Sequence, residues 1–256
     1  MTRGYMNQLT GFLWFVFMLA PLIFLQRLLH REIQAVFLIL TRSAQFTMVV
    51  FQMIFLPGVF VHEASHFLMA KILRVPTGRF SILPKPLPNG RLQLGYVETA
   101  HADIVRDSLI GAAPLITGTI CVAYIAFYQL EVRLLLDVLR EGQLNLFWLG
   151  IRALPTVQDF YLWFYLAFAI SSTMTPSQSD RHAWLELIIA FGVLFSLALL
   201  IGAGPWMWDN LAPLISDFLS SVAVIFGLSS VIHVVLALPT ALIHKALARV
   251  TGVDVV

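Results

Sequence analysis

The chain has 256 residues, of which 59% are hydrophobic and 12% are charged, and its formal net charge is +2 at pH 7. An ordinary soluble domain carries about 25% charged residues, so this chain has too little polar material to cover a water-facing surface. Its mean hydropathy of +0.85 indicates that lipid is its solvent. The small net charge and the lack of a basic block exclude a nucleic-acid partner.

Six apolar segments come close to the length of about 20 residues that a membrane-spanning helix needs. They are 11–29, 45–73, 108–128, 157–175, 183–203 and 218–243. Residues 30–44 are expected to continue the first helix, and 129–155 to form one amphipathic helix at the interface. The predicted fold class is therefore an all-α polytopic membrane protein, with residues 1–256 as a single integral membrane domain.

The stretch 75–107, after the second span, differs from the rest because its prolines oppose helix formation. Asn89-Gly90 separates two strand-like runs, which is a hairpin signal. We therefore expect a short β-hairpin-like loop near the membrane face. An even number of spans places both termini on the same side of the membrane. Lys and Arg are in excess on that side, which predicts that both termini are cytoplasmic. The expected location is the cytoplasmic membrane of a prokaryote.

The second span contains His62-Glu63-Ala64-Ser65-His66. Residues four apart lie on one face of a helix, so His62 and His66 can direct their imidazoles at one metal ion. Glu63 follows the first histidine and can act as a general base on water. Two nitrogen ligands, a base and an open coordination position are what zinc-dependent hydrolysis needs. Zn²⁺ is therefore the expected cofactor.

The apolar residues around this motif argue against a chance match to the His-Glu-x-x-His pattern. An ionisable residue at the centre of a bilayer costs on the order of 2.5–3.5 kcal/mol, and such residues usually mark function. Three of them within five positions are hard to explain by packing alone. The alternative, a coincidental match to a short pattern, is more common in soluble proteins, where His and Glu are ordinary surface residues.

Residues 62–70 resemble the first signature of the site-two protease group of intramembrane zinc metalloproteases, with Ala70 as the small residue that follows the second histidine. The resemblance covers roughly residues 55–185, within a metalloprotease-like core of about 45–185. The flanking segments 1–44 and 186–256 are apolar helices without a specific signal. Gly111-Ala112-Ala113-Pro114 is similar to a later signature of this group, although Ala113 replaces a glycine and Thr117 an asparagine. Read without the family, the same segment is a close helix-packing face.

The resemblance also implies a third metal ligand, an aspartate near the end of a later span, and Asp180 is the best match. An alternative and compatible interpretation makes Ser177 the N-cap of the fifth span, with Asp180 in its first turn. His182 is close enough in sequence to replace Asp180 or to support it. His101 could polarise a substrate carbonyl, and the alternative is that it is a polar residue at the interface. His233 is expected to form a hydrogen bond within the helix bundle.

The function that the resemblance implies is hydrolysis of peptide bonds in membrane-embedded or membrane-proximal segments, with Glu63 as the general base. The implied partners are the lipid bilayer, a membrane-protein substrate and possible partner membrane subunits. Two alternatives stay open. One is a catalytically silent, protease-like structural or accessory subunit, which the departures at Ala113 and Thr117 favour. The other is a transporter whose histidines bind a passing ion, which would need polar residues along several spans.

Overall fold

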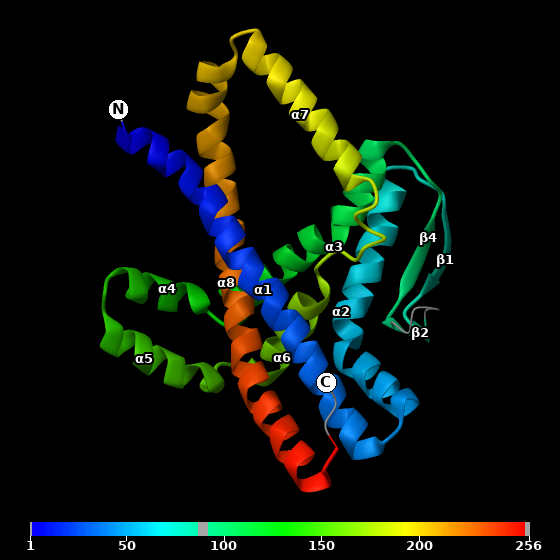
Figure 1. Cartoon of the computed structure of the whole chain (residues 1–256). Coiled ribbons are helices and arrows are strands. Elements are labelled where there is room, and N and C mark those ends of the chain that lie inside the picture. Colours follow the sequence, from blue (N-terminus) through cyan, green and yellow to red (C-terminus); the bar gives the residue numbers. More distant parts are fainter. Residues whose placement is uncertain (1, 87–91, 254–256) are drawn as a thin grey trace.

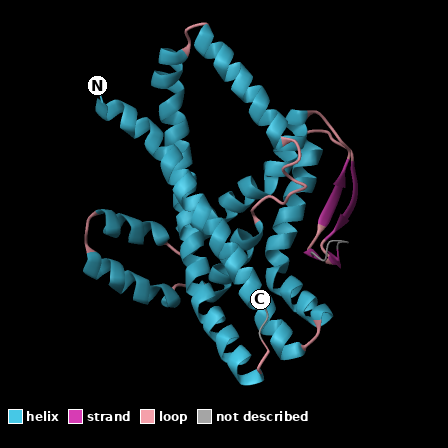
Figure 2. Ribbon diagram, in the orientation of Figure 1, coloured by secondary structure: helices cyan, strands magenta, loops and turns pink. Residues whose placement is uncertain are grey.

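The computed structural model describes residues 2–86 and 92–253 and shows a predominantly helical protein with a small β region (Figures 1 and 2). Its helices are α1 (Thr2–Thr41), α2 (Ala44–Ile72), α3 (Ile104–Tyr124), α4 (Val132–Arg140), α5 (Leu144–Ala153), α6 (Phe160–Thr173), α7 (Trp184–Leu200) and α8 (Gly204–Thr251). A π-helical turn, Ile125–Gln129, extends α3, and a 3₁₀ turn, Leu154–Thr156, follows α5. The strands are β1 (Thr77–Ser81), β2 (Lys85–Pro86), β3 (Leu92–Gln93) and β4 (Tyr96–Thr99).

Four helices in the described part of the chain are long and apolar enough to cross a membrane, namely α1, α2, α3 with its π-helical extension, and α8. The expected number of six spans is therefore not confirmed. The two remaining predicted spans form the shorter helices α6, with 14 residues, and α7, with 17. Asp159 has a left-handed backbone conformation (φ 54°), so α6 begins only at Phe160, after the predicted start at residue 157. The helix ends at Thr173, shortly before Pro176. The mostly helical fold and the apolar helices are as the sequence predicts.

The two segments expected at the interface have different outcomes. Residues 30–41 continue α1 as one unbroken helix. The stretch 129–155, predicted as a single amphipathic helix, instead contains the separate helices α4 and α5. Gly142 divides them at φ +73°, a left-handed conformation that glycine adopts without the steric cost that a side chain brings.

Helices α1 and α8 run alongside each other through the middle of the molecule, where they appear in blue and in orange to red (Figure 1). Their contact buries Leu22 of α1 and Phe226 of α8. Toward the other end of the pair, the Nδ1 atom of His244 lies 2.6 Å from a carboxylate oxygen of Glu32, and both side chains are buried. A second apolar cluster around Phe55 joins α1 to α2 and α6.

Large apolar side chains face outward over much of the surface. Across α7, residues 184–200, no side chain is buried, and Ile188, Phe191 and Leu194 are each more than 60% exposed. Exposing such a surface to water would cost about 25 cal/mol of free energy per Å² of apolar area. This pattern is compatible with an integral membrane protein, whose outer helices contact lipid.

The β region lies beside α2, on the outer side of the bundle (Figure 2). Strand β1 pairs antiparallel with β4, and β2 pairs antiparallel with β3. The side chain of Gln52 in α2 donates a hydrogen bond to the carbonyl of Ile82 (2.6 Å), which ties the sheet to the helix. The expected hairpin-like loop is therefore present, while its predicted turn, Asn89-Gly90, lies outside the described residues.

Candidate metal centre

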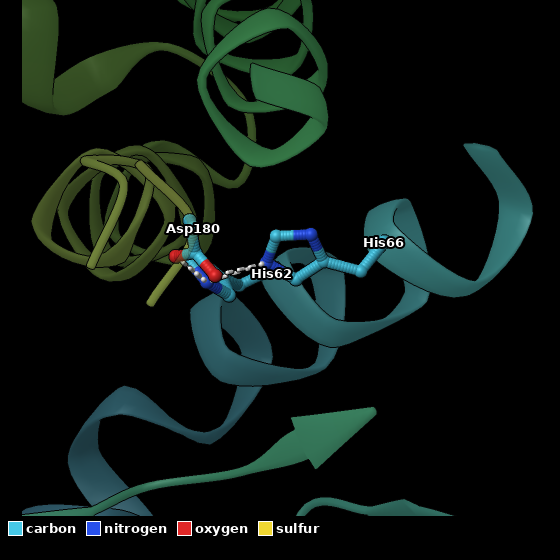
Figure 3. Close-up of side chains that lie close together, drawn as sticks. All are labelled: His62, His66 and Asp180. Carbon is cyan, nitrogen blue, oxygen red and sulfur yellow. Dashed lines mark hydrogen bonds and ion pairs between the residues drawn. The ribbon is translucent and has the colours of Figure 1, made fainter. Parts of the chain in front are cut away.

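His62 and His66 lie one turn apart on the same face of α2, as their spacing predicts. Their ring centroids are 4.8 Å apart, and their Nε2 atoms approach to 3.2 Å (Figure 3). Helix α2 is held at its start by Ser43, whose side chain accepts a hydrogen bond from the backbone N–H of Phe46. Gly58 allows α2 to approach the backbone of α6 at Ala169 so closely that a Cβ atom would collide with the carbonyl oxygen there.

The other ring nitrogen of each histidine is bound to a backbone carbonyl. His62 Nδ1 lies 2.6 Å from the carbonyl oxygen of Thr173, at the end of α6, and His66 Nδ1 lies 2.8 Å from that of Ile110 in α3. A carbonyl oxygen only accepts, so each Nδ1 carries the proton and donates it. These bonds orient both rings with Nε2 toward the same point and connect α2 to two neighbouring helices.

Asp180 reaches this point from the loop between α6 and α7. Its Oδ2 atom is 3.7 Å from His62 Nε2, and its Oδ1 atom is 3.4 Å from His66 Nε2 (Figure 3). Burial alone would raise the pKa of this carboxyl, but the two imidazoles and Ser177 outweigh burial and hold the pKa well below its usual range. An ionised carboxylate and two imidazole nitrogens therefore converge, and a proton or a metal cation is needed between them to offset the repulsion of their lone pairs.

The loop that carries Asp180 is shaped by a reciprocal pair of hydrogen bonds. The backbone N–H of Ser177 donates to Asp180 Oδ2 (2.6 Å), and the backbone N–H of Asp180 donates to the hydroxyl of Ser177 (3.3 Å). The prediction that Ser177 caps the fifth span was wrong, because α7 starts only at Trp184 with Ala183 in the cap position. Ser177 instead closes a local turn that directs the carboxylate toward the histidines.

Helix α3 packs against this loop through the segment Gly111–Pro114. A Cβ atom at Gly111 would collide with the backbone carbonyl oxygen of Asp180, and Ala113 and Pro114 are buried. About two turns after Gly111, a Cβ atom at Gly118 would collide with the side chain of Met174, 2.4 Å from its Cβ atom. The helix-packing interpretation of this segment therefore agrees with the structure, and the surface that it packs against is the loop of a candidate ligand.

Glu63 is buried beside the two histidines, at the place where the β region meets α2. Gly95, just before β4, lies against it: a Cβ atom there would be 2.7 Å from Glu63 Cγ and 2.9 Å from Glu63 Oε1. The same Cβ atom would be 2.9 Å from the carbonyl oxygen of Ser81. The absence of a side chain at Gly95 therefore lets the strand region cover the Glu63 carboxylate.

The other histidines singled out in the sequence lie in different surroundings. His182 does not take the place of Asp180; its Nε2 atom lies 3.4 Å from a carboxylate oxygen of Asp107. His101 is next to the same oxygen, at 3.8 Å. Asp107 was missed in the sequence, although its position in the first turn of α3, six residues after His101, was a usable signal. His233 is buried and hydrogen-bonded to Ser172 in α6 (3.0 Å), the bundle contact expected for it.

No family model, curated protein or solved structure matches this chain. The resemblance of residues 62–70 to the site-two protease group thus stays a prediction from the motif. Among the described residues, His62, His66 and Asp180 form one of two groups whose arrangement could hold a metal ion, and His101, Asp107 and His182 form the other.

Proposed function

We propose that this protein is an intramembrane zinc metalloprotease in which His62, His66 and Asp180 bind Zn²⁺ and Glu63 is the general base. The observation that carries the proposal is the convergence of the three donor groups from two segments more than 100 residues apart in the chain. The helical spacing of the histidines needs only α2, but the aspartate is brought there by the packing of α3, α6 and the loop after α6.

The spacing of the donors supports a small tetrahedral ion. Zinc–ligand bonds of about 2.0–2.1 Å in tetrahedral geometry separate neighbouring donors by about 3.3 Å. Here the two nitrogens are 3.2 Å apart, and the carboxylate lies at a similar distance from both, with Oδ1 3.4 Å from His66 Nε2 and Oδ2 3.7 Å from His62 Nε2. Three protein ligands leave a fourth position open, which is the pattern of catalytic rather than structural zinc sites.

The hydrogen bonds of the histidines support the same assignment. Histidines that bind a metal usually donate their second N–H to a carbonyl or carboxylate, which fixes the tautomer and the ring orientation. His62 and His66 both do so, to Thr173 and Ile110. The Nε2 atoms are thereby left as acceptors, which is the form that a metal requires.

The chemistry follows from the roles of the neighbouring groups. Zinc, when bound, supplies Lewis acidity that lowers the pKa of water toward about 7 and polarises a carbonyl group. Glu63 accepts the proton of the attacking water and returns it to the leaving nitrogen of the peptide bond. The burial of Glu63 excludes bulk water from this exchange. The substrate is an unwound membrane-embedded or membrane-proximal segment, aligned by strand addition to the β region.

The setting of the enzyme is part of the proposal. We infer that it acts in the cytoplasmic membrane of a prokaryote, with both termini in the cytoplasm and with a membrane protein as substrate. The apolar surface of the helices supports a lipid environment. The excess of Lys and Arg on one side of the predicted topology supports the orientation.

One observation favours a second candidate, a silent accessory subunit that binds metal without hydrolysing peptides. Gly95 lies directly against Glu63, so the strand region has to shift before a substrate carbonyl and a water can be placed beside the carboxylate. A subunit of this kind keeps the strand region closed.

The test is metal content and peptidase activity of detergent-purified protein, with wild type beside His62→Ala, His66→Ala and Glu63→Gln. We expect about one zinc per chain in wild type and in Glu63→Gln, and loss of zinc in both histidine variants. Glu63→Gln, which preserves side-chain shape, should lose cleavage of single-span model substrates. Zinc-free wild type after reconstitution in zinc-containing buffer would refute the metal site. Zinc-loaded wild type no more active than Glu63→Gln would favour the silent subunit.

A further inference from the structure

A second group of metal-binding side chains lies outside the proposed zinc site. His101 follows β4, Asp107 is in the first turn of α3, and His182 is in the loop before α7. Asp107 Oδ2 lies 3.4 Å from His182 Nε2 and 3.8 Å from His101 Nδ1. One donor atom from each of the three residues falls within 4.8 Å of the other two.

The hydrogen bonds around this group orient its inward atoms. His182 Nδ1 lies 2.7 Å from the carbonyl oxygen of Ser179, so this nitrogen donates its proton, and in the neutral imidazole Nε2 faces Asp107 as an acceptor. The Oδ1 atom of Asp107 accepts the backbone N–H of Ala102 (3.1 Å), which fixes the carboxylate with Oδ2 toward the histidines. The carboxylate group is itself largely buried, with 11% of the side chain exposed.

We propose that His101, Asp107 and His182 form a second divalent-cation site, separate from the His62–His66–Asp180 site. Two imidazoles and one carboxylate are a donor set that suits zinc and the neighbouring transition metals rather than calcium or magnesium. The site is weaker than the first, because His101 is 94% exposed and loses side-chain entropy on binding. It takes its remaining ligands from solvent.

The position of the site gives it a structural role. His101 belongs to the connection from the sheet to α3, and His182 to the same loop as Asp180. An ion held by both therefore joins the end of the sheet that covers Glu63 to the loop that carries a ligand of the first site. Ser108 already contributes to this junction, with its hydroxyl donating to the carbonyl of Ala183 (3.3 Å). The proposed ion restrains the junction further, and a cation that binds only the folded state stabilises it.

The competing state is an ion pair in which His182 is protonated. The bond from its Nδ1 atom to Ser179, together with the nearby Asp107 carboxylate, raises the pKa of His182. A proton then fills the space between Nε2 and Oδ2, and His101 has no function in the cluster. The two states differ in one measurable respect, since only the cation site needs His101.

The experiment is a zinc titration of the full-length His62→Ala/His66→Ala variant by equilibrium dialysis and elemental analysis. This background removes the first site, so the result is independent of whether the proposed protease function is correct. We expect about one zinc ion to remain bound per chain. Adding His101→Gln or Asp107→Asn should weaken that binding by at least about tenfold. Loss of a residue that only orients a metal ligand already lowers metal affinity by about 10–100-fold, and loss of the ligand itself should lower it at least as much.

The matched control is Asp103→Asn in the same background. Asp103 caps α3 and is also acidic, but it pairs with Arg106 and lies outside the cluster, and asparagine is an equally good cap. Its zinc binding should be unchanged. His101→Gln alters a side chain that is almost fully exposed, so its effect does not arise from unfolding. Absence of zinc in the background variant, or equal affinity in His101→Gln and Asp103→Asn, would overturn the proposal.

Discussion

Gly111 of α3 packs against the backbone carbonyl of Asp180, and a Cβ atom at this position would collide with the carbonyl oxygen. The neighbouring residue, Ile110, accepts the Nδ1–H of His66. One turn of α3 therefore contacts two of the three proposed metal ligands. The close approach that Gly111 allows fixes the distance between the aspartate loop and α2.

Gly111→Val should displace the Asp180 loop and weaken zinc binding. Overpacking at a close contact costs about 1–3 kcal/mol in stability, and the shift of a metal ligand should lower zinc affinity by about 10–100-fold. Both are measured on purified protein, by thermal denaturation and by competition with a chelator. Gly192→Val in α7 is the control, since among the described residues nothing beyond the adjacent backbone of α7 lies within 4 Å of a Cβ atom there. Equal zinc affinity in the two variants would show that Gly111 does not position the loop.

Asp180→Asn should reduce zinc affinity more than Ser177→Ala. Asparagine retains an oxygen for the N–H of Ser177 but removes the negative charge that the ion requires, so a loss of at least about 10–100-fold is expected. Ser177→Ala removes the acceptor for the Asp180 N–H and the hydrogen bond with the Ser179 hydroxyl, but leaves the carboxylate in place. Chelator competition on the two variants compares them directly. If Ser177→Ala loses as much affinity as Asp180→Asn, the turn and not the charge is the dominant contribution.

Gly95→Val should separate metal binding from catalysis. The added side chain meets Glu63 and the Ser81 carbonyl, so the strand region or the carboxylate has to move. The three atoms nearest to the added Cβ atom belong to Glu63 and Ser81 and not to a proposed metal ligand, so zinc content should stay at the wild-type level. A displacement of about 1 Å at a catalytic group costs on the order of 10²-fold in rate, and cleavage of a model substrate should fall accordingly. Loss of zinc together with activity would mean that the β region also supports the ligands.

The buried pair of Glu32 and His244 should stabilise the contact between α1 and α8. His244→Ala leaves Glu32 Oε2 without the nitrogen that lies 2.6 Å away, while Oε1 keeps its ion pair with Arg31 (2.9 Å). An unsatisfied buried polar atom costs about 1–3 kcal/mol. The melting temperature in detergent, at fixed protein concentration, should fall. Thr251→Ala, near the end of the same helix, removes an exposed hydroxyl that bonds only to backbone groups, those of Leu247 and Val253, and should have little effect. A similar melting temperature for both variants would contradict a stabilising role.

Much of the proposed zinc site follows from local sequence. The His-Glu-x-x-His pattern places both histidines on one helix face wherever that helix lies, because the geometry repeats about every 3.6 residues. The apolar runs likewise predict helices and a lipid environment from composition alone. The number of spans was less predictable, because Asp159 and Pro176 shorten the apolar segment between them to the 14 residues of α6.

The convergence of distant residues was decided only by the tertiary structure. Asp180 could be matched to a family pattern, but its contact with His62 depends on the packing of Gly111 and on the turn at Ser177. The cluster of His101, Asp107 and His182 joins three segments that no sequence spacing relates. Helical periodicity is a property of neighbouring residues, so the sequence by itself determined that His62, Glu63 and His66 lie together on one helix. Close packing between helices acts across the chain, and it alone determined which carboxylate lies beside each pair of histidines.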